Sequence, residues 1–143
     1  MLRAAQRGST LAWTAVFLGL VLVPLLMLIG DGARLLYVRA RLATATDAAC
    51  ENAAWSTAGR PNWQWYSDDR FLQTALLQAA QTTFYQMLAE QNKVQYTPAL
   101  SVSLDSTHTI VACSAQARVP LLVTLGQEVT MRVRVNARMR FAR

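Results

Sequence analysis

The sequence predicts an α+β protein in which a long N-terminal transmembrane helix continues into a small domain with a second helix and a three-stranded antiparallel sheet. Three observations carry this prediction. An uncharged run of 23 residues lies near the N-terminus. After it, apolar residues recur every three to four positions, and in the C-terminal third apolar and polar residues alternate. The apolar run, the helical pattern and the strand pattern follow one another along the chain, and the sequence has no internal repeat.

The first element is the uncharged segment from Gly8 to Gly30, GSTLAWTAVFLGLVLVPLLMLIG, preceded by Arg3 and Arg7. A bilayer-spanning helix needs about 20 mainly apolar residues, and basic residues typically flank it. A cleaved secretory signal has a shorter apolar core and a small-residue cleavage site directly after it. The nearest such motif here, Ala43-Thr44-Ala45, lies far beyond the segment. We therefore expect residues 1–33 to form a basic segment and a transmembrane helix.

The remaining residues, 34–143, have room for one small domain. The chain of 143 residues has 14 Lys plus Arg against 8 Asp plus Glu, a net charge of +6. A basic chain can contact acidic partners such as lipid headgroups, nucleic acid or anionic polymers. Charge alone selects none of these classes.

A helical period continues after the apolar segment, in steps of three and four residues. Its apolar positions are Leu35, Val38, Leu42, Ala45 and Ala49. The pattern predicts one helix from about Thr10 to Ala58, ended by Gly59 and Pro61. Pro24 is a potential kink within it.

A second helix is predicted from a cap at Ser67 or Asp68 to about Gln91. Its expected buried face comprises Leu72, Leu76, Ala79, Ala80, Thr83 and Met87. The connector before it contains Trp63, Trp65 and Tyr66. These aromatic residues fit either a satellite core or the headgroup level of a bilayer, and a small domain favours the core.

Three strands are predicted after this helix. The first holds Tyr96, Leu100, Val102 and Leu104, and Asp105 to His108 forms a turn. The second places Val111, Cys113, Ala115, Ala117 and Val119 on one face and ends at Pro120. The third runs from Val129 to Phe141 and alternates apolar residues with Arg132, Arg134, Arg138 and Arg140.

The two cysteines, Cys50 and Cys113, both follow the apolar segment. Two cysteines in a small domain suit a disulfide in an oxidising compartment, and two free buried thiols are the alternative. A disulfide would bridge the first helix and the second strand. It would also place the domain outside the cytoplasm, with the N-terminus inside, since the flanking arginines alone do not decide orientation.

The order of several short motifs resembles the TadE/TadG-like proteins of tight-adherence (Flp) pilus systems, in their shorter TadE-like branch. The opening is Arg7-Gly8-Ser9, the apolar helix contains Pro24, and Asp31-Gly32-Ala33-Arg34 is followed by Tyr37 and an Ala-rich stretch. The tail is similar as well, with Val119-Pro120-Leu121, Gly126 and a terminal alternating strand.

The resemblance implies a non-enzymatic minor pilin or pseudopilin with a pilin-like periplasmic domain, held in the inner membrane and serving cell adhesion through a pilus. Its partners would be membrane lipid and other pilus subunits. Gly8 and Ser9 flank the candidate processing site. Related prepilins carry Glu five residues after the glycine, where this chain has Trp13, which favours an accessory membrane component over a subunit of the filament shaft.

An alternative hypothesis is a membrane-tethered binding module that captures an acidic ligand on the arginine strip Arg132, Arg134, Arg138 and Arg140. We do not expect nucleic acid as the partner, because no aromatic stacking platform accompanies the strip. His108 is the single histidine and falls in a predicted turn. No catalytic, metal-binding or cofactor motif is recognisable, so the sequence predicts neither an enzyme nor a small-molecule substrate.

Overall fold

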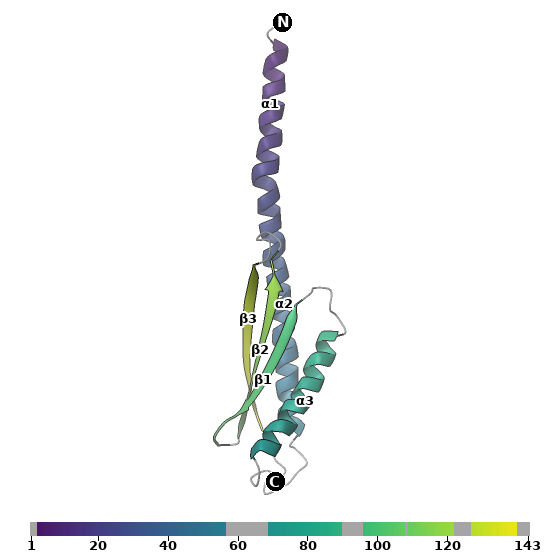
Figure 1. The fold of residues 1–143 in the computed structure, drawn as a ribbon, viewed down its shortest axis with the longest axis vertical. Coiled ribbons are helices and arrows are strands. Elements are labelled where there is room, and N and C mark those ends of the chain that lie inside the picture. Colours follow the sequence, from purple (N-terminus) through teal and green to yellow (C-terminus); the bar gives the residue numbers. More distant parts are fainter. Residues whose placement is uncertain (1–2, 57–68, 90–95, 108, 122–126, 140–143) are drawn as a thin grey trace.

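The helical part of the protein is a single rod that projects far beyond a small sheet-containing domain (Figure 1). The computed structural model describes residues 3–56, 69–89, 96–107, 109–121 and 127–139. The rod consists of α1 (Arg3–Phe17), the π-helical turn η1 (Leu18–Leu22) and α2 (Val23–Ser56). The predicted continuous helix is therefore present, and it begins seven residues earlier than expected, at Arg3 instead of Thr10.

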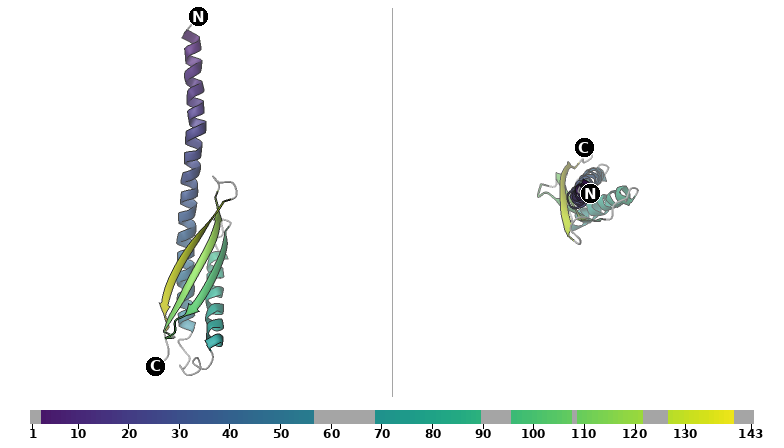
Figure 2. Two further views of the ribbon diagram at one scale, coloured as in Figure 1. Left: turned by 60° about the vertical axis from the view of Figure 1, so that its left-hand side comes forward. Right: turned by 90° about the horizontal axis from the view of Figure 1, so that it is seen from above.

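Pro24 widens the helix instead of ending it. Proline has no N–H to donate to the carbonyl four residues earlier, and its ring crowds that carbonyl. The turn just before it is η1, in which the Val23 N–H donates to the Leu18 carbonyl, five residues back. A π-turn is a common way to absorb such a disruption. The rod continues without a sharp bend through this point (Figure 2).

The lower half of α2 forms the centre of the core. Val38, Leu42 and Ala49 are fully buried and Ala45 is nearly so, which confirms the predicted helix face. The Thr46 hydroxyl is also buried, and it donates a hydrogen bond of 2.6 Å to the Leu42 carbonyl. A buried hydroxyl with a local partner avoids the cost of an unpaired polar group.

The second helix, α3 (Asp69–Ala89), packs antiparallel to α2 (Figure 1). Asn52 of α2 joins the two helices, since its Nδ2 donates to the Ala79 carbonyl at 3.3 Å and to the Thr83 hydroxyl at 2.7 Å. The predicted cap residues Ser67 and Asp68 and the aromatic residues Trp63, Trp65 and Tyr66 lie outside the described ranges.

The buried face of α3 differs in part from the predicted one. Leu72, Leu76, Ala80 and Phe84 are buried, whereas Met87 is 40% exposed. Steps of four residues drift by about 40° around a helix of 3.6 residues per turn, so this stripe slants as it does where two helices cross. The slanted stripe ends on Phe84, and the prediction of Met87 as a core residue was wrong.

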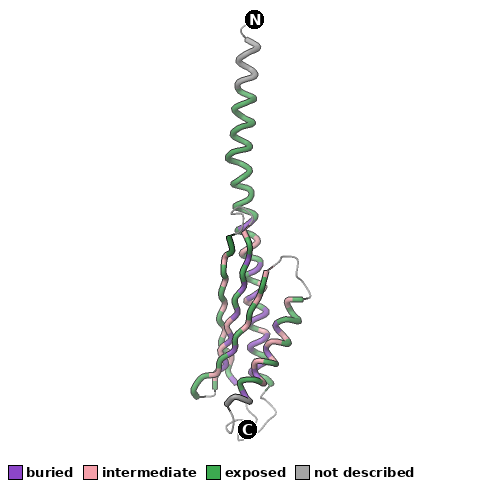
Figure 3. Tube along the Cα trace, in the orientation of Figure 1, coloured by how far each residue is buried: buried purple, intermediate pink, exposed green. Residues whose placement is uncertain are grey.

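The sheet consists of β1 (Thr97–Leu104), β2 (Ile110–Pro120) and β3 (Glu128–Arg138), antiparallel and in the order β1-β2-β3. It forms a layer that covers α2 and α3 (Figure 2). The inner face of β2 is fully buried along its length, and the tube view shows the same stripe (Figure 3). Its residues are Val111, Cys113, Ala115, Ala117 and Val119. The α+β architecture is thus the predicted one.

Candidate assembly surface

The apolar helix leaves a long surface without a protein partner. Every residue from 10 to 30 is exposed, including Leu11, Trp13 and Leu20, each more than 70% exposed. Exposed apolar surface on this scale is unfavourable in water and is normally covered by lipid or by other protein. The helix that contains this segment is long and apolar enough to cross a membrane.

The exposed segment ends at Asp31, which is only 6% exposed. From this residue onward α2 enters the domain. Further along α2, the Arg41 guanidinium lies 5.9 Å from the centroid of the Tyr37 ring, a cation–π contact. Its buried Nη2 has no hydrogen-bond partner within the part of the chain that is described. Burial raises the pKa of the nearby Tyr96, and the positive charge of Arg41 opposes this shift.

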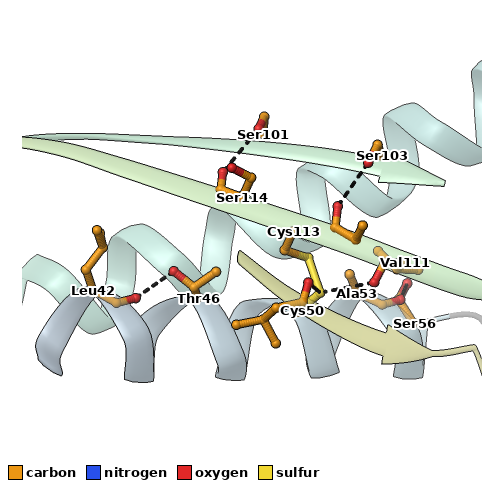
Figure 4. Close-up of a disulfide and its surroundings, with 12 residues drawn as sticks. Leu42, Thr46, Cys50, Ala53, Ser56, Ser101, Ser103, Val111, Cys113 and Ser114 are labelled. Atoms are coloured by element: carbon orange, nitrogen blue, oxygen red, sulfur yellow. Dashed lines mark hydrogen bonds between the residues drawn. A yellow bond between two sulfur atoms is a disulfide. The ribbon is translucent and has the colours of Figure 1, made fainter. Parts of the chain in front are cut away.

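Cys50 and Cys113 are joined by a disulfide between α2 and the middle of β2, with their Cα atoms 5.7 Å apart (Figure 4). Both residues are fully buried. The Cys50 sulfur lies 3.5 Å from the Val111 carbonyl oxygen and 3.7 Å from that of Val135. A disulfide sulfur carries no proton, so these are packing contacts. The bond therefore fastens the sheet to the helical rod at the centre of the core.

The arginine strip lies on the outer face of the sheet, away from the helices. Arg132, Arg134 and Arg138 alternate with inner-face residues of β3, and all three are exposed. Arg118 of β2 lies on the same face, opposite Thr130. Arg140, the fourth predicted member, lies outside the described residues.

Two shallow hollows occupy the rest of this face. One, of about 450 Å³, has Arg132 in its wall, and the other, of about 410 Å³, has Arg134. Their remaining walls are mainly small or polar residues, such as Ser101 and Ser114 in the first and Ser103 and Ala112 in the second. The Ser101 hydroxyl donates to the Ser114 carbonyl at 3.1 Å, and the Ser103 hydroxyl to the Ala112 carbonyl at 3.3 Å (Figure 4).

Acidic residues lie on the other side of β3, where α2 passes behind it. Asp47, Glu51 and Trp55 line a cavity of about 200 Å³ together with Asn136 and Arg138. These three residues of α2 were not predicted as a group from the sequence. The signal of this group is the spacing of four residues, which places 47, 51 and 55 on one face of a helix. Which strand that face meets is decided by the packing of α2 on the sheet.

The remaining predicted site residues are not brought together. Gly8 and Ser9 lie within α1, so a bond between them would be cleaved in a helical backbone. His108 lies outside the described residues. Among the residues that the structure describes, no cluster of three His, Cys, Asp or Glu side chains could hold a metal ion.

Comparison with known proteins gives a match for the rod. Residues 8–55 match a family model described as Flp pilus-assembly TadE/G-like. The match covers about a third of the 143 residues. It takes in most of α1, all of η1 and α2 to one residue before its end. No curated protein and no solved structure matches the chain.

The matched helix has two environments along its length. Its first part is the exposed apolar segment, and its second part is the buried centre of the domain. The family match therefore covers both the membrane-spanning candidate and the element on which the sheet is assembled. The sheet itself and α3 lie outside the match.

Proposed function

We propose that this protein is a non-enzymatic, minor-pilin-like component of Flp pilus assembly. Residues 1–33 anchor it in the inner membrane, and residues 34–143 form its extracytoplasmic domain, with the N-terminus in the cytoplasm. The observation that carries the proposal is the coincidence of the TadE/G-like match with the exposed apolar helix. Its partners in this role are membrane lipid and other pilus subunits.

Two further observations support this role. The disulfide suits an oxidising compartment outside the cytoplasm. The rod joins the membrane segment to the domain core without a flexible linker, so the domain is held at a fixed place relative to the bilayer (Figure 1). A fixed domain next to the membrane suits a protein that acts by contact with neighbouring subunits.

The proposal is tested by deleting the gene in its own host and complementing it with the full chain. Pili sheared from the cell surface are then counted by electron microscopy and measured by immunoblot of the pilin. We expect deletion to abolish or strongly reduce piliation and the wild-type chain to restore it. Normal piliation in the deletion strain would contradict the proposal.

Substitutions on the helix refine this test, but the choice of position matters. Val38 and Leu42 are fully buried, so changes there affect folding before they affect assembly. Leu36, which is 69% exposed, and Tyr37, which is 41% exposed, lie just beyond the membrane segment on the outward side of α2. We expect Leu36→Glu to reduce piliation while the protein still accumulates with its disulfide.

A further inference from the structure

Among the residues that the structure describes, no strand pairs with the outer edge of β3. The Met139 N–H donates to the Thr109 carbonyl at 2.8 Å, and the Leu121 N–H donates to the Gln127 carbonyl at 3.0 Å. These two bonds bracket an unbroken register of eleven pairs between β2 and β3. In an antiparallel ladder, residues alternate between facing the partner strand and facing away. The even-numbered residues of β3, from Glu128 to Arg138, therefore turn their N–H and C=O groups outward.

Within the described ranges, the outward side of β3 has no neighbouring strand. All even-numbered residues of this strand are exposed, and β3 ends the sheet (Figure 1). On the inner face, Met131, Val133 and Val135 are only partly buried against the core. The inner face of the neighbouring β2 is fully buried by contrast. A fourth strand beside β3 would complete the burial of these three side chains.

The opposite edge is protected. The Asp105 N–H donates to the Ile110 carbonyl, so by the same alternation the even-numbered residues of β1 face outward. Pro98 is one of them and has no N–H to offer. β1 is also three residues shorter than β3, and α3 contacts it. Short edge strands and edge prolines are common protections against strand addition, and β3 has neither.

Charge determines which strand the β3 edge can accept. Arg132, Arg134 and Arg138 are all exposed on the outer face of the edge strand, and Arg118 stands beside them on β2. Like charges opposite one another destabilise strand pairing, and opposite charges stabilise it. Two copies of β3 would oppose arginine to arginine. A strand with Asp or Glu on its outer face would lie directly beside the guanidinium groups of Arg132, Arg134 and Arg138 on β3.

The inner side of the same edge determines which side chains the partner strand can carry on its inward-pointing face. Asp47 and Glu51 line the cavity beside Asn136 and Arg138. Both carboxylates are exposed, so acidic side chains pointing inward from an added strand would be repelled there. The partner strand must therefore alternate acidic residues on one face with apolar or neutral residues on the other.

We infer that β3 pairs with an extended, acidic-alternating strand of another membrane-anchored assembly protein, which becomes the fourth strand of the sheet. This inference rests on the proposed function and names the surface by which the protein would act. An eleven-residue strand spans roughly 36 Å at 3.3 Å per residue. The contact would thus run along the length of the sheet, which lies obliquely beside the rod (Figure 2).

Proline scanning at Thr130 and Asn136 tests the inference. Both side chains lie on the exposed outer face, and both N–H groups point away from β2. Thr130→Pro and Asn136→Pro therefore remove an outward N–H without breaking a bond inside the sheet. The matched controls Thr130→Ala and Asn136→Ala change the same side chains and retain the N–H. All four variants are expressed as full chains in the native host.

The partner is read out by photo-crosslinking. A p-benzoylphenylalanine residue is placed at position 130 or 136, and at position 101 or 103 of β1 as a control. Crosslinked peptides are sequenced by mass spectrometry. We expect positions 130 and 136 to crosslink to one short segment with Asp or Glu at every second residue, and the β1 positions not to do so. We expect each proline variant to lose at least 10-fold in this crosslink and in piliation, and each alanine variant to retain both.

Two kinds of result would overturn the inference. Proline variants that keep their disulfide and crosslink like wild type would show that the edge is not used. Crosslinks to lipid, to nucleic acid or to β3 of a second copy would assign the edge a different occupant. These results leave the proposed role in piliation intact, because that role is decided separately by the deletion strain. Conversely, a deletion strain with normal piliation, together with a crosslink to an acidic strand, would refute only the proposed role in piliation.

Discussion

Cys50 and Cys113 show how much a single pair of residues contributes to this domain. They are 63 residues apart in sequence and join the central helix to the central strand. In the chain-entropy account, cross-linking a loop of that length stabilises the folded state by about 4 kcal/mol. That is a large share of the stability of a small domain, which is typically about 5–15 kcal/mol. The bond therefore contributes a large part of the folding stability of the domain.

We expect the double variant Cys50→Ala/Cys113→Ala to lose about 4 kcal/mol of unfolding free energy. The double change leaves no lone thiol in the core. Urea unfolding of the full chain in detergent, followed by near-ultraviolet circular dichroism, measures the loss. Wild-type protein treated with reductant should lose a similar amount. A change below about 1 kcal/mol in both samples would contradict the expected contribution.

The pKa of Asp105 is affected by a local hydrogen bond. The Thr107 hydroxyl donates to the Asp105 carboxylate at 2.6 Å, and this bond holds the pKa of Asp105 below its ordinary value. A lowered folded-state pKa contributes stability above the unfolded-state pKa, and the contribution is lost as pH falls through the folded-state value. The contribution of this hydrogen bond to stability is therefore lost only as the pH falls through the lowered pKa of Asp105.

We expect Thr107→Val to raise the pKa of Asp105 toward its ordinary value, since valine has no hydroxyl to donate. Carboxyl chemical shifts measured by NMR across an acid titration report this directly. Thr107→Ser keeps the donor and should leave the pKa low. An unchanged pKa in the valine variant would show that the hydroxyl is not the cause.

At the scale of elements, α2 has two functions in one helix. Its first turns belong to the exposed apolar segment, and its remainder supplies the centre of the core. Leu36 and Leu42 illustrate the change, because the first is 69% exposed and the second is fully buried. Removing a leucine side chain should therefore affect folding stability at one position and have little effect at the other, six residues away.

We expect Leu42→Ala to cost about 2–5 kcal/mol of unfolding free energy, because it removes buried methyl groups and leaves a cavity. The matched control Leu36→Ala should change it by no more than about 0.5 kcal/mol. Urea unfolding of both full-length variants in detergent compares them. Equal losses would mean that Leu36 is covered in the folded protein, which would contradict its exposure.

At the scale of the whole molecule, the protein is an exposed apolar helix and a sheet-containing domain arranged along one axis. The apolar segment lies at one end of the rod, and the sheet runs beside the other (Figures 1 and 3). The topology that we propose places the sheet outside the cytoplasm. The fate of the N-terminus decides whether the protein is processed as a pilin or retained as an accessory component.

We expect alkaline phosphatase fused after Arg143 to be active in the native host, because the C-terminal domain would lie outside the cytoplasm. An active cytoplasmic reporter and an inactive phosphatase fusion would reverse the topology. Intact mass of the protein purified from membranes without reductant then reports on processing. We expect residues beyond Met1 to be retained, since Trp13 stands where processed relatives have Glu. Loss of residues 1–8 would instead place the protein among the processed pilins.

The sequence by itself determined the long apolar segment, the continuous helix and the three strands, because these follow from the local order of apolar and polar residues. It also placed Cys113 on the apolar face of its strand and the arginines on the opposite face of the last one. Only the tertiary structure decided that α3 buries Phe84 instead of Met87, that Asp47 and Glu51 lie beside β3, and that β3 is the open edge. These three features depend on the angle at which the helices cross and on the order of the strands. Both arise from packing between segments far apart in the chain, so the local sequence pattern of a single segment does not reveal them.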